Sequence, residues 1–183
     1  MKSKSKISMM TMMLITSVLI IPLIAAAPDS IPLVADGGEY YDAEARYGIV
    51  IGSVDVTNNA SHLVVTYTIT VDDWYLNETH LAVGDNSGDL PQTKKGNPRP
   101  GKFSRNDDHL PGVKTFTYEI PLGEISHDGT ITIATHAAVT NLDEIVYTDP
   151  ETGEVYFREE SAWGEGSSFV GGNWAMYFDY SVQ

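Results

Sequence analysis

The sequence predicts an all-β fold, a single antiparallel β-sandwich or jelly-roll-like domain with a long irregular loop. Short runs rich in Val, Ile, Thr and Tyr alternate apolar and polar residues, as in HLVVTYTITV at residues 62–71. Clusters of turn residues such as NNAS and DPETG separate these runs. No window shows a sustained helical period, and the chain is long enough for one domain with a sizeable core.

The expected elements follow one another along the chain. Residues 47–56 and 62–71 are expected to form a hairpin around a polar turn, and residues 74–83 the next strand. The long irregular loop is expected at residues 84–112. Further strands are predicted at residues 113–122 and 129–139, then a small hairpin around DPETG, and a closing strand at residues 173–182.

The N-terminal segment, residues 1–26, is expected to be a secretory signal peptide. Lys2, Lys4 and Lys6 precede an apolar run over residues 7–24, and small residues follow at Ala25 and Ala26. A retained membrane anchor is the alternative, because the run is nearly long enough to span a bilayer. Cleavage after Ala26 would leave an arm with a hinge at residues 27–38 and a β-domain at residues 39–183, so the expected location is extracellular or at the cell surface.

The charge of the chain restricts its partners. Only 11 Lys and Arg oppose 25 Asp and Glu, and cleavage would remove three of the lysines. Such a field repels nucleic acids and anionic membranes and attracts cations, although it could also serve solubility alone. Because the chain has no cysteine, it has no disulfide and no thiolate metal site.

The arm contains a short apolar run formed by Ile31, Leu33 and Val34. It must lie along a sheet edge, either as the first strand of its own domain or as a strand donated to another copy. Pro32 cannot donate a backbone hydrogen bond, and Gly37 and Gly38 provide a hinge. Donation would join copies head to tail into an open polymer.

The long loop holds most of the positive charge of the β-domain and is a candidate assembly surface. A basic loop on an acidic body suits an acidic face of a neighbouring copy, although it could equally be a solvated surface loop. Its basic residues are Lys94, Lys95, Arg99, Lys102 and Arg105.

Calcium is the cofactor that the sequence favours. Asp85, Ser87 and Asp89 alternate as at the start of many calcium loops, and Glu165 is a further candidate ligand. In a loop that starts at Asp85 the twelfth position is Gly96 rather than a bidentate Glu, so the stretch is no EF-hand and a site would need oxygens from several loops. Asp149, Glu151 and Glu154 add to the acidic loops.

The residues that could support catalysis are few, so no enzymatic activity is expected. His80 and His136 lie in strand-like stretches, where structural histidines are more frequent than zinc ligands or bases. No nucleophile elbow or phosphate loop occurs, and carboxylate pairs for a glycosidase arise by chance in so acidic a chain.

Two further features concern the surface. Asn59 (NAS) and Asn77 (NET) are glycosylation sequons, of which Asn59 lies in a predicted turn. ESAWGEG is expected to form a loop over one end of the sandwich, where Trp163 would close the core or stack on a sugar. In the closing strand, alternation would direct Trp174, Phe178 and Tyr180, with Met176, into the core.

Together these motifs carry a resemblance. The ordered set W.LNETHLAVG, PQTKKGNPRPGKF, YEIPLG, IATHAAV and ESAWGEG...F.G.NWAMYFDY resembles a family of secreted archaeal and bacterial β-domains. Over roughly residues 47–182 the chain is similar to the cannula-forming proteins of hyperthermophilic archaea, whose subunits build extracellular tubules. The resemblance implies a β-sandwich subunit, calcium-assisted assembly and strand exchange between neighbours.

The expected function is therefore a structural subunit of an extracellular filament or tubule, with copies of itself as partners. The alternative is a monomeric secreted domain that binds glycans or mediates adhesion.

Overall fold

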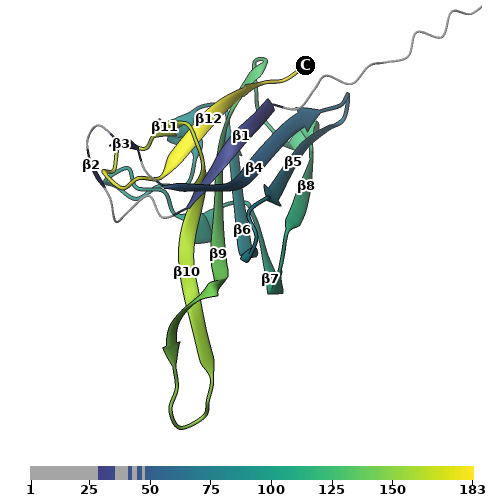
Figure 1. Ribbon diagram of the computed structural model, residues 1–183. Coiled ribbons are helices and arrows are strands. Elements are labelled where there is room, and N and C mark those ends of the chain that lie inside the picture. Colours follow the sequence, from purple (N-terminus) through teal and green to yellow (C-terminus); the bar gives the residue numbers. More distant parts are fainter. Residues whose placement is uncertain (1–28, 36–40, 43–44, 47) are drawn as a thin grey trace, which may run out of the picture.

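The computed structural model describes residues 29–35, 41–42, 45–46 and 48–183. These residues form an all-β, antiparallel domain, which confirms the predicted fold class (Figure 1). The strands are β1 (Asp29–Ala35), β2 (Tyr41–Asp42), β3 (Ala45–Arg46), β4 (Ile49–Asn58), β5 (His62–Ile69), β6 (Trp74–Gly84), β7 (Arg105–Val113), β8 (Thr115–Pro121), β9 (Thr130–Thr148), β10 (Val155–Gly164), β11 (Ser167–Ser168) and β12 (Met176–Ser181). Short 3₁₀ turns lie at η1 (Ser87–Asp89), η2 (Pro100–Lys102) and η3 (Leu122–Glu124).

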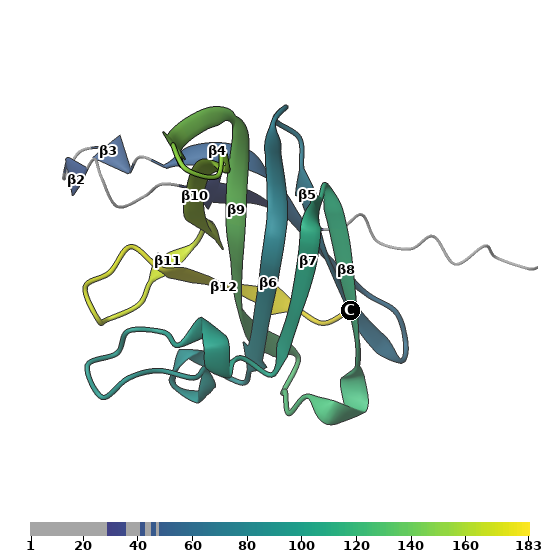
Figure 2. The same ribbon diagram turned by 90° about the horizontal axis from the view of Figure 1, so that it is seen from below.

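The main sheet curls until it is nearly a closed barrel (Figure 2). Its strands follow the order β8-β5-β4-β1-β10-β9-β6-β7, and β12 pairs with the first part of β9 on the edge that β10 uses further along. The end strands, β7 and β8, form no ladder with each other. Strand β9 is therefore the element to which β6, β10 and β12 are all attached.

The core lies inside the curled sheet, where alternate residues of several strands are buried. In β5 this alternation is complete, since Leu63, Val65 and Tyr67 are fully buried and the residues between them are partly exposed. Burying a large apolar side chain contributes about 1.5–3 kcal/mol. The largest fully buried members are Tyr67, Leu33, Ile51, Leu63, Leu76, Leu81, Ile131 and Ile133.

A second apolar cluster covers the outer face of β6 and β9. Ala82 and Ala134 of these strands contact a layer made by two loops, at residues 85–104 and 165–175. Trp163 of β10 is central to this layer, with ring centroids 6.4 Å from both Phe103 and Phe169. The two loops are thus held on the barrel by buried aromatic side chains.

Three expectations about the elements are wrong. The predicted loop at residues 84–112 ends early, because residues 105–113 form β7, whose exposed edge position hides any apolar alternation. The predicted strand at 129–139 and the first strand of the small hairpin are one continuous strand, β9. Residues 160–164 belong to β10 rather than to a loop over the sandwich, and Trp163 is buried there.

The closing strand is predicted in part. Phe178 and Tyr180 of β12 are buried in the core, as the alternation indicates. Trp174 precedes the strand, however, and only borders the second cluster together with Met176.

Strand β1, the described part of the N-terminal arm, lies in the middle of the sheet. It pairs with β4 along its whole length and with β10 through Leu33, Val34 and Ala35. Leu33 is fully buried, Val34 is 9% exposed and Ile31 packs against the core. In the single chain the arm is thus the first strand of its own domain, and exchange between copies stays a prediction.

The expected signal peptide at residues 1–26 and the hinge at Gly37 and Gly38 lie outside the described residues. Within the part of the chain that is described, no helix is long and apolar enough to cross a membrane.

Among the described glycines, Gly52 of β4 leaves the least room for a side chain. A Cβ atom at this position would lie 1.8 Å from the carbonyl oxygen of Thr68 in β5. We expect Gly52→Ala to lower the free energy of unfolding by about 2–4 kcal/mol, because backbone rather than a flexible side chain must move. At Gly123 a Cβ atom would meet nothing within 4 Å, so Gly123→Ala is the matched control. Urea denaturation measures both variants, and equal stabilities would contradict this account of the β4–β5 contact.

Candidate functional site

The feature that departs most from a closed domain is the outer half of the β9–β10 hairpin, residues 142–158, here called the arm. Pairing of β9 with β6 ends at Asn141, and pairing of β10 with β1 involves only residues from Ala162 onward. Over the arm, β9 and β10 pair only with each other. Figure 1 shows the arm extending from one end of the barrel, well beyond every other strand.

The arm exposes large apolar side chains. Ile145 and Val146 are both 59% exposed, and Tyr147 is 54% exposed. Leu142, Val155 and Tyr156 are also largely exposed. So many exposed apolar side chains on one element are typical of a protein–protein contact.

The arm is nevertheless an ordered ribbon. At its tip, Asp149 Oδ1 accepts a hydrogen bond of 2.8 Å from the backbone N–H of Glu151, which lowers the pKa of this carboxyl, and Gly153 adopts a φ of 73°. Tyr147 and Tyr156 lie opposite each other with ring centroids 5.7 Å apart. Because an isolated two-stranded hairpin is only marginally stable in water, these contacts favour a defined shape before any partner binds.

At the base of the arm, an arginine joins the two strands. Arg158 donates hydrogen bonds to Glu144 across the hairpin at 3.1 Å and to Glu160 at 2.9 Å. It is the one basic residue between positions 142 and 158, where the acidic residues are Asp143, Glu144, Asp149, Glu151 and Glu154. The arm is therefore both apolar and negatively charged.

Beside the arm is an open hollow of about 1060 Å³. Its lining includes Val146 and Tyr156 from the arm, Glu159 and Ser161 from β10, and Trp174 from the loop before β12. The hollow combines aromatic faces with carboxylates, which suits either a protein side chain or a sugar.

The predicted basic residues lie on the loop at residues 85–104, here called the basic loop, except Arg105. Lys94 and Lys95 are exposed at the tip of a small turn, which Gly96 N closes on Thr93 O at 2.9 Å. Arg99 and Lys102 are exposed as well, whereas Arg105 starts β7 and binds Glu124 at 2.7 Å. Four of the five candidate assembly cations are thus exposed on one loop.

The turn of the basic loop packs against the loop at residues 165–175. Gly171 approaches Asn97 so closely that a Cβ atom would lie 2.1 Å from the Asn97 Oδ1 atom. Val170, which precedes it, is 94% exposed. Viewed along the arm in Figure 2, the two loops project together from one side of the barrel.

The predicted calcium ligands are not gathered into one group. Asp89 Oδ2 accepts hydrogen bonds from the backbone and side chain of Asn86, so this carboxylate caps its own 3₁₀ turn next to Asp85 and Ser87. Glu165 follows β10, and its N–H donates to Pro32 O. Among the described residues, no three acidic or histidine side chains lie close enough together to hold a metal ion.

The two sequons occupy different environments. Asn59 lies exposed in the turn between β4 and β5, where its Oδ1 accepts hydrogen bonds from Ser61 and His62. Asn77 lies in β6, and its side-chain amide donates to Thr140. The exposed turn is the more accessible acceptor, as the sequence indicates.

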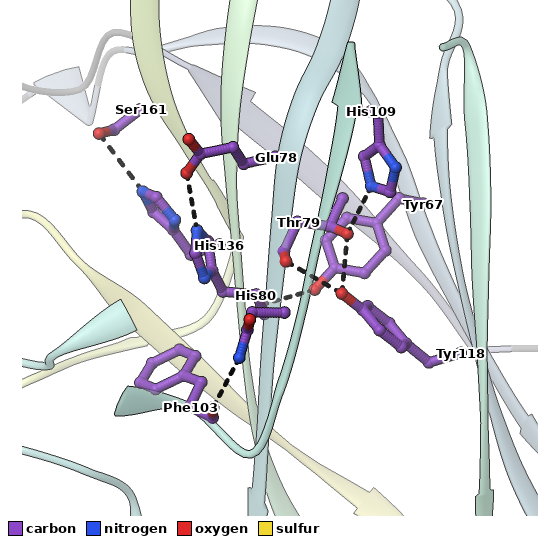
Figure 3. Close-up of polar contacts among 10 residues, drawn as sticks. Tyr67, Glu78, Thr79, His80, Phe103, His109, Tyr118, His136 and Ser161 are labelled. Atoms are coloured by element: carbon purple, nitrogen blue, oxygen red, sulfur yellow. Dashed lines mark hydrogen bonds and ion pairs between the residues drawn. The ribbon is translucent and has the colours of Figure 1, made fainter. Parts of the chain in front are cut away.

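His80 and His136 form a directly opposed pair on β6 and β9 (Figure 3). Their ring centroids are 5.2 Å apart, and the His136 ring lies 4.8 Å from that of Trp163. His80 contacts Glu78 and His136 contacts Ser161, but both Nδ1 atoms are buried without a hydrogen-bond partner. Burial, and secondarily His80, lowers the pKa of His136 to about 3.

This pair lacks the arrangement of a hydrolase site. Ser161 lies 3.4 Å from His136 Nε2, but no carboxylate orients the other ring nitrogen, as a catalytic triad requires. A histidine with so low a pKa is also a weak base. The pair instead packs the outer face of the sheet.

A second cluster of polar side chains joins β7 and β8, the two end strands of the sheet, which share no ladder (Figure 3). Thr79 Oγ1 of β6 lies 2.8 Å from His109 Nε2 of β7 and 2.9 Å from the Tyr118 hydroxyl of β8. The Tyr118 hydroxyl also donates to Thr79 O, and burial raises its pKa to about 12. The His109 and Phe116 rings stack across the seam at 4.2 Å. Side chains thus close the barrel between β7 and β8.

Comparisons with protein-family models, curated proteins and solved structures find no match to this chain. The resemblance to cannula-forming proteins therefore stays an expectation. The hairpin around DPETG is confirmed, but sequence reasoning missed that it extends beyond the barrel as the arm, although one signal was present. The stretches EIVYT and EVYF on either side of DPETG have apolar residues at successive positions. A strand with one buried face would alternate apolar and polar residues, so this pattern predicts a ribbon with apolar side chains on both faces.

The buried histidine pair predicts a dependence of stability on pH. Because the pKa of His136 is lowered in the folded state, the unfolded chain binds more protons below its ordinary pKa near 6.5, so acidification destabilises the fold. Between about pH 7 and 5.5 this residue should account for about 1 kcal/mol of lost stability.

His136→Phe preserves ring packing but cannot titrate, so its urea midpoint should fall less over this interval than that of the unchanged protein. His127, exposed in a turn, provides the control His127→Gln, which should behave like the unchanged protein. If the urea midpoints of the unchanged protein and of His136→Phe fell in parallel with pH, His136 would not be the source of the lost stability.

Proposed function

We propose that this chain is a structural subunit that self-associates into an extracellular filament or tubule. The observation that supports this most directly is the arm, an ordered, apolar and acidic ribbon that extends from an otherwise closed domain. On a monomer, such a surface would be an aggregation liability. In a polymer, it is a contact between copies.

The magnitudes favour apolar contact as the source of affinity. Burying the exposed part of each large arm side chain contributes on the order of 1 kcal/mol, and several such side chains act together. Exposed ion pairs contribute only about 0.2–1 kcal/mol each and are screened by salt. Charges therefore set the orientation and the rate of association more than its strength.

Strand β1 supports a second contact, donor-strand exchange. It lies between β4 and β10 and buries Leu33, so a domain without it would have an open groove with two unpaired strand edges. A β1 strand supplied by another copy would form the same hydrogen bonds. In this proposal the chain is exported by residues 1–26, and the hinge at Gly37 and Gly38 lets β1 reach the neighbour.

Calcium assists the assembly in this proposal. The described residues of one chain do not bring three ligands together, so the ion would bridge carboxylates from neighbouring copies. Such binding would also neutralise part of the strong negative charge that separates the subunits.

The direct test is the state of association of the purified chain after removal of residues 1–26. With millimolar calcium we expect polymers in size-exclusion chromatography with light scattering and filaments or tubes in electron microscopy. With a chelator, association and melting temperature should both fall. A monomer at every protein and calcium concentration would overturn the proposal.

Polar substitutions on the arm should abolish association without unfolding the domain. Val146→Ser with Tyr147→Ser removes exposed apolar surface far from the core, so the melting temperature should stay nearly unchanged while the polymer fraction falls about tenfold or more. Glu119→Gln, exposed on β8, is the control. Normal assembly of the arm variant would exclude the arm as a contact.

Strand exchange is tested by supplying β1 separately. A chain that begins at Gly38 should be destabilised, because it lacks Leu33 and the strand between β4 and β10. Addition of a synthetic peptide of residues 27–36 should raise its melting temperature, and a peptide with Leu33→Asp should not. If the peptide with the native sequence has no effect, β1 cannot be exchanged between chains.

The hollow supports the alternative, a monomeric glycan-binding or adhesion domain. Trp174 and Tyr156 would stack on sugar rings, while Glu159 and Arg158 would bind hydroxyl groups. Binding of the monomer to a polysaccharide array, lost in Trp174→Ala, would favour this function over assembly.

A further inference from the structure

We propose that the arm of one copy binds the basic loop of a second copy. This inference rests on the proposed function and names the partner surface of the arm. It also differs from strand exchange, because it needs no rearrangement of either copy.

The charges of the two surfaces are complementary. Five carboxylates and one arginine lie between residues 142 and 158, whereas the basic loop exposes Lys94, Lys95, Arg99 and Lys102. These four side chains form no ion pair with any described residue. In so acidic a chain, the basic loop is the main concentration of positive charge, so it is the surface that the acidic arm of another copy would approach.

Both surfaces also have an apolar part. The arm exposes Val146 and Tyr147, and the loop at residues 165–175 exposes Val170, which is 94% accessible. Val170 lies next to the lysine turn, since a Cβ atom at Gly96 would be 3.3 Å from Val170 Cβ. A contact that covers Val170 and places Lys94 and Lys95 over arm carboxylates therefore satisfies both the apolar and the charged groups.

The two surfaces are built to keep their shape. Buried Leu90 and Phe103 anchor the basic loop on the second cluster, and the approach of Gly171 to Asn97 fixes its turn against the neighbouring loop. The arm projects from one end of the barrel, and the basic loop projects from one side together with the loop at residues 165–175 (Figures 1 and 2). Because one copy presents the two halves of the contact at different places, the contact joins unlike surfaces and can repeat as an open chain.

The absence of cysteine makes a direct test available. Tyr147→Cys and Lys95→Cys are prepared as separate variants and mixed under oxidising conditions, so that any disulfide between arm and loop must join two copies. We expect a mixed dimer at about tenfold the yield given by Tyr147→Cys with Glu119→Cys, because binding raises the local thiol concentration. Equal yields would overturn the inference. So would dimers of Tyr147→Cys alone in the same yield, since these would show an arm-to-arm contact.

A charge exchange provides a second, independent test. Lys94→Glu with Lys95→Glu, or Glu151→Lys with Glu154→Lys, should each slow assembly about tenfold or more at low salt. A chain with all four substitutions should assemble again, because the attraction is restored with reversed signs. If the chain with all four substitutions assembles more slowly than either double variant, the arm and the basic loop do not meet.

The two proposals fail in different ways. If the unchanged protein stays monomeric, the proposed function is wrong. If it assembles normally while the mixed disulfide is absent and the charge reversals are without effect, the polymer exists but the arm binds another surface.

Discussion

The rest of the structure depends on the hydrogen-bond ladder of β9. This strand pairs with β6 on one edge and with β12 and then β10 on the other, so its register positions the strands on both of its sides. The same register places His80 opposite His136 and brings Trp163 beside them, where the covering loops are anchored. Since β9 then continues past the last residue that β6 can pair, the strand that organises the core also forms the arm.

Two kinds of contact close this domain, and they differ in strength. Over most of its circumference the barrel is closed by backbone ladders, but the gap between β7 and β8 is bridged by Thr79, His109, Tyr118 and their aromatic neighbours. Buried polar groups that all find partners hold such a seam firmly, and the loss of one member leaves others unpaired. A single polar substitution in the seam is thus expected to weaken the closure of the barrel.

The extent to which the sequence predicts the structure varies along the chain. Strands with one buried face, such as β5, alternate so regularly that their positions follow from the sequence. Strand β7 could not be found in this way, because its edge position leaves Asn106, Asp107 and Asp108 exposed and its pairing uses backbone atoms alone. Phe178 and Tyr180 were recognised as core, but one of the two loops that bury Trp163, at residues 85–104, is distant in sequence and left no local signal. The basic loop was predicted from composition, whereas the arm became visible only from the ends of its pairing.

The central position of β1 has a consequence for the order in which the fold can form. The strand is made first, yet one of its two partners is β10, and Ala35 pairs with Ala162. Contacts between residues so far apart in sequence close late and slowly, because a long loop must be ordered before they form. A chain emerging from the ribosome therefore keeps its first strand without one neighbour until nearly all of the domain has been synthesised. During this interval the edge of β1 that later pairs with β10 has no partner within its own chain, so its backbone N–H and C=O groups depend on water or on other strands until β10 arrives.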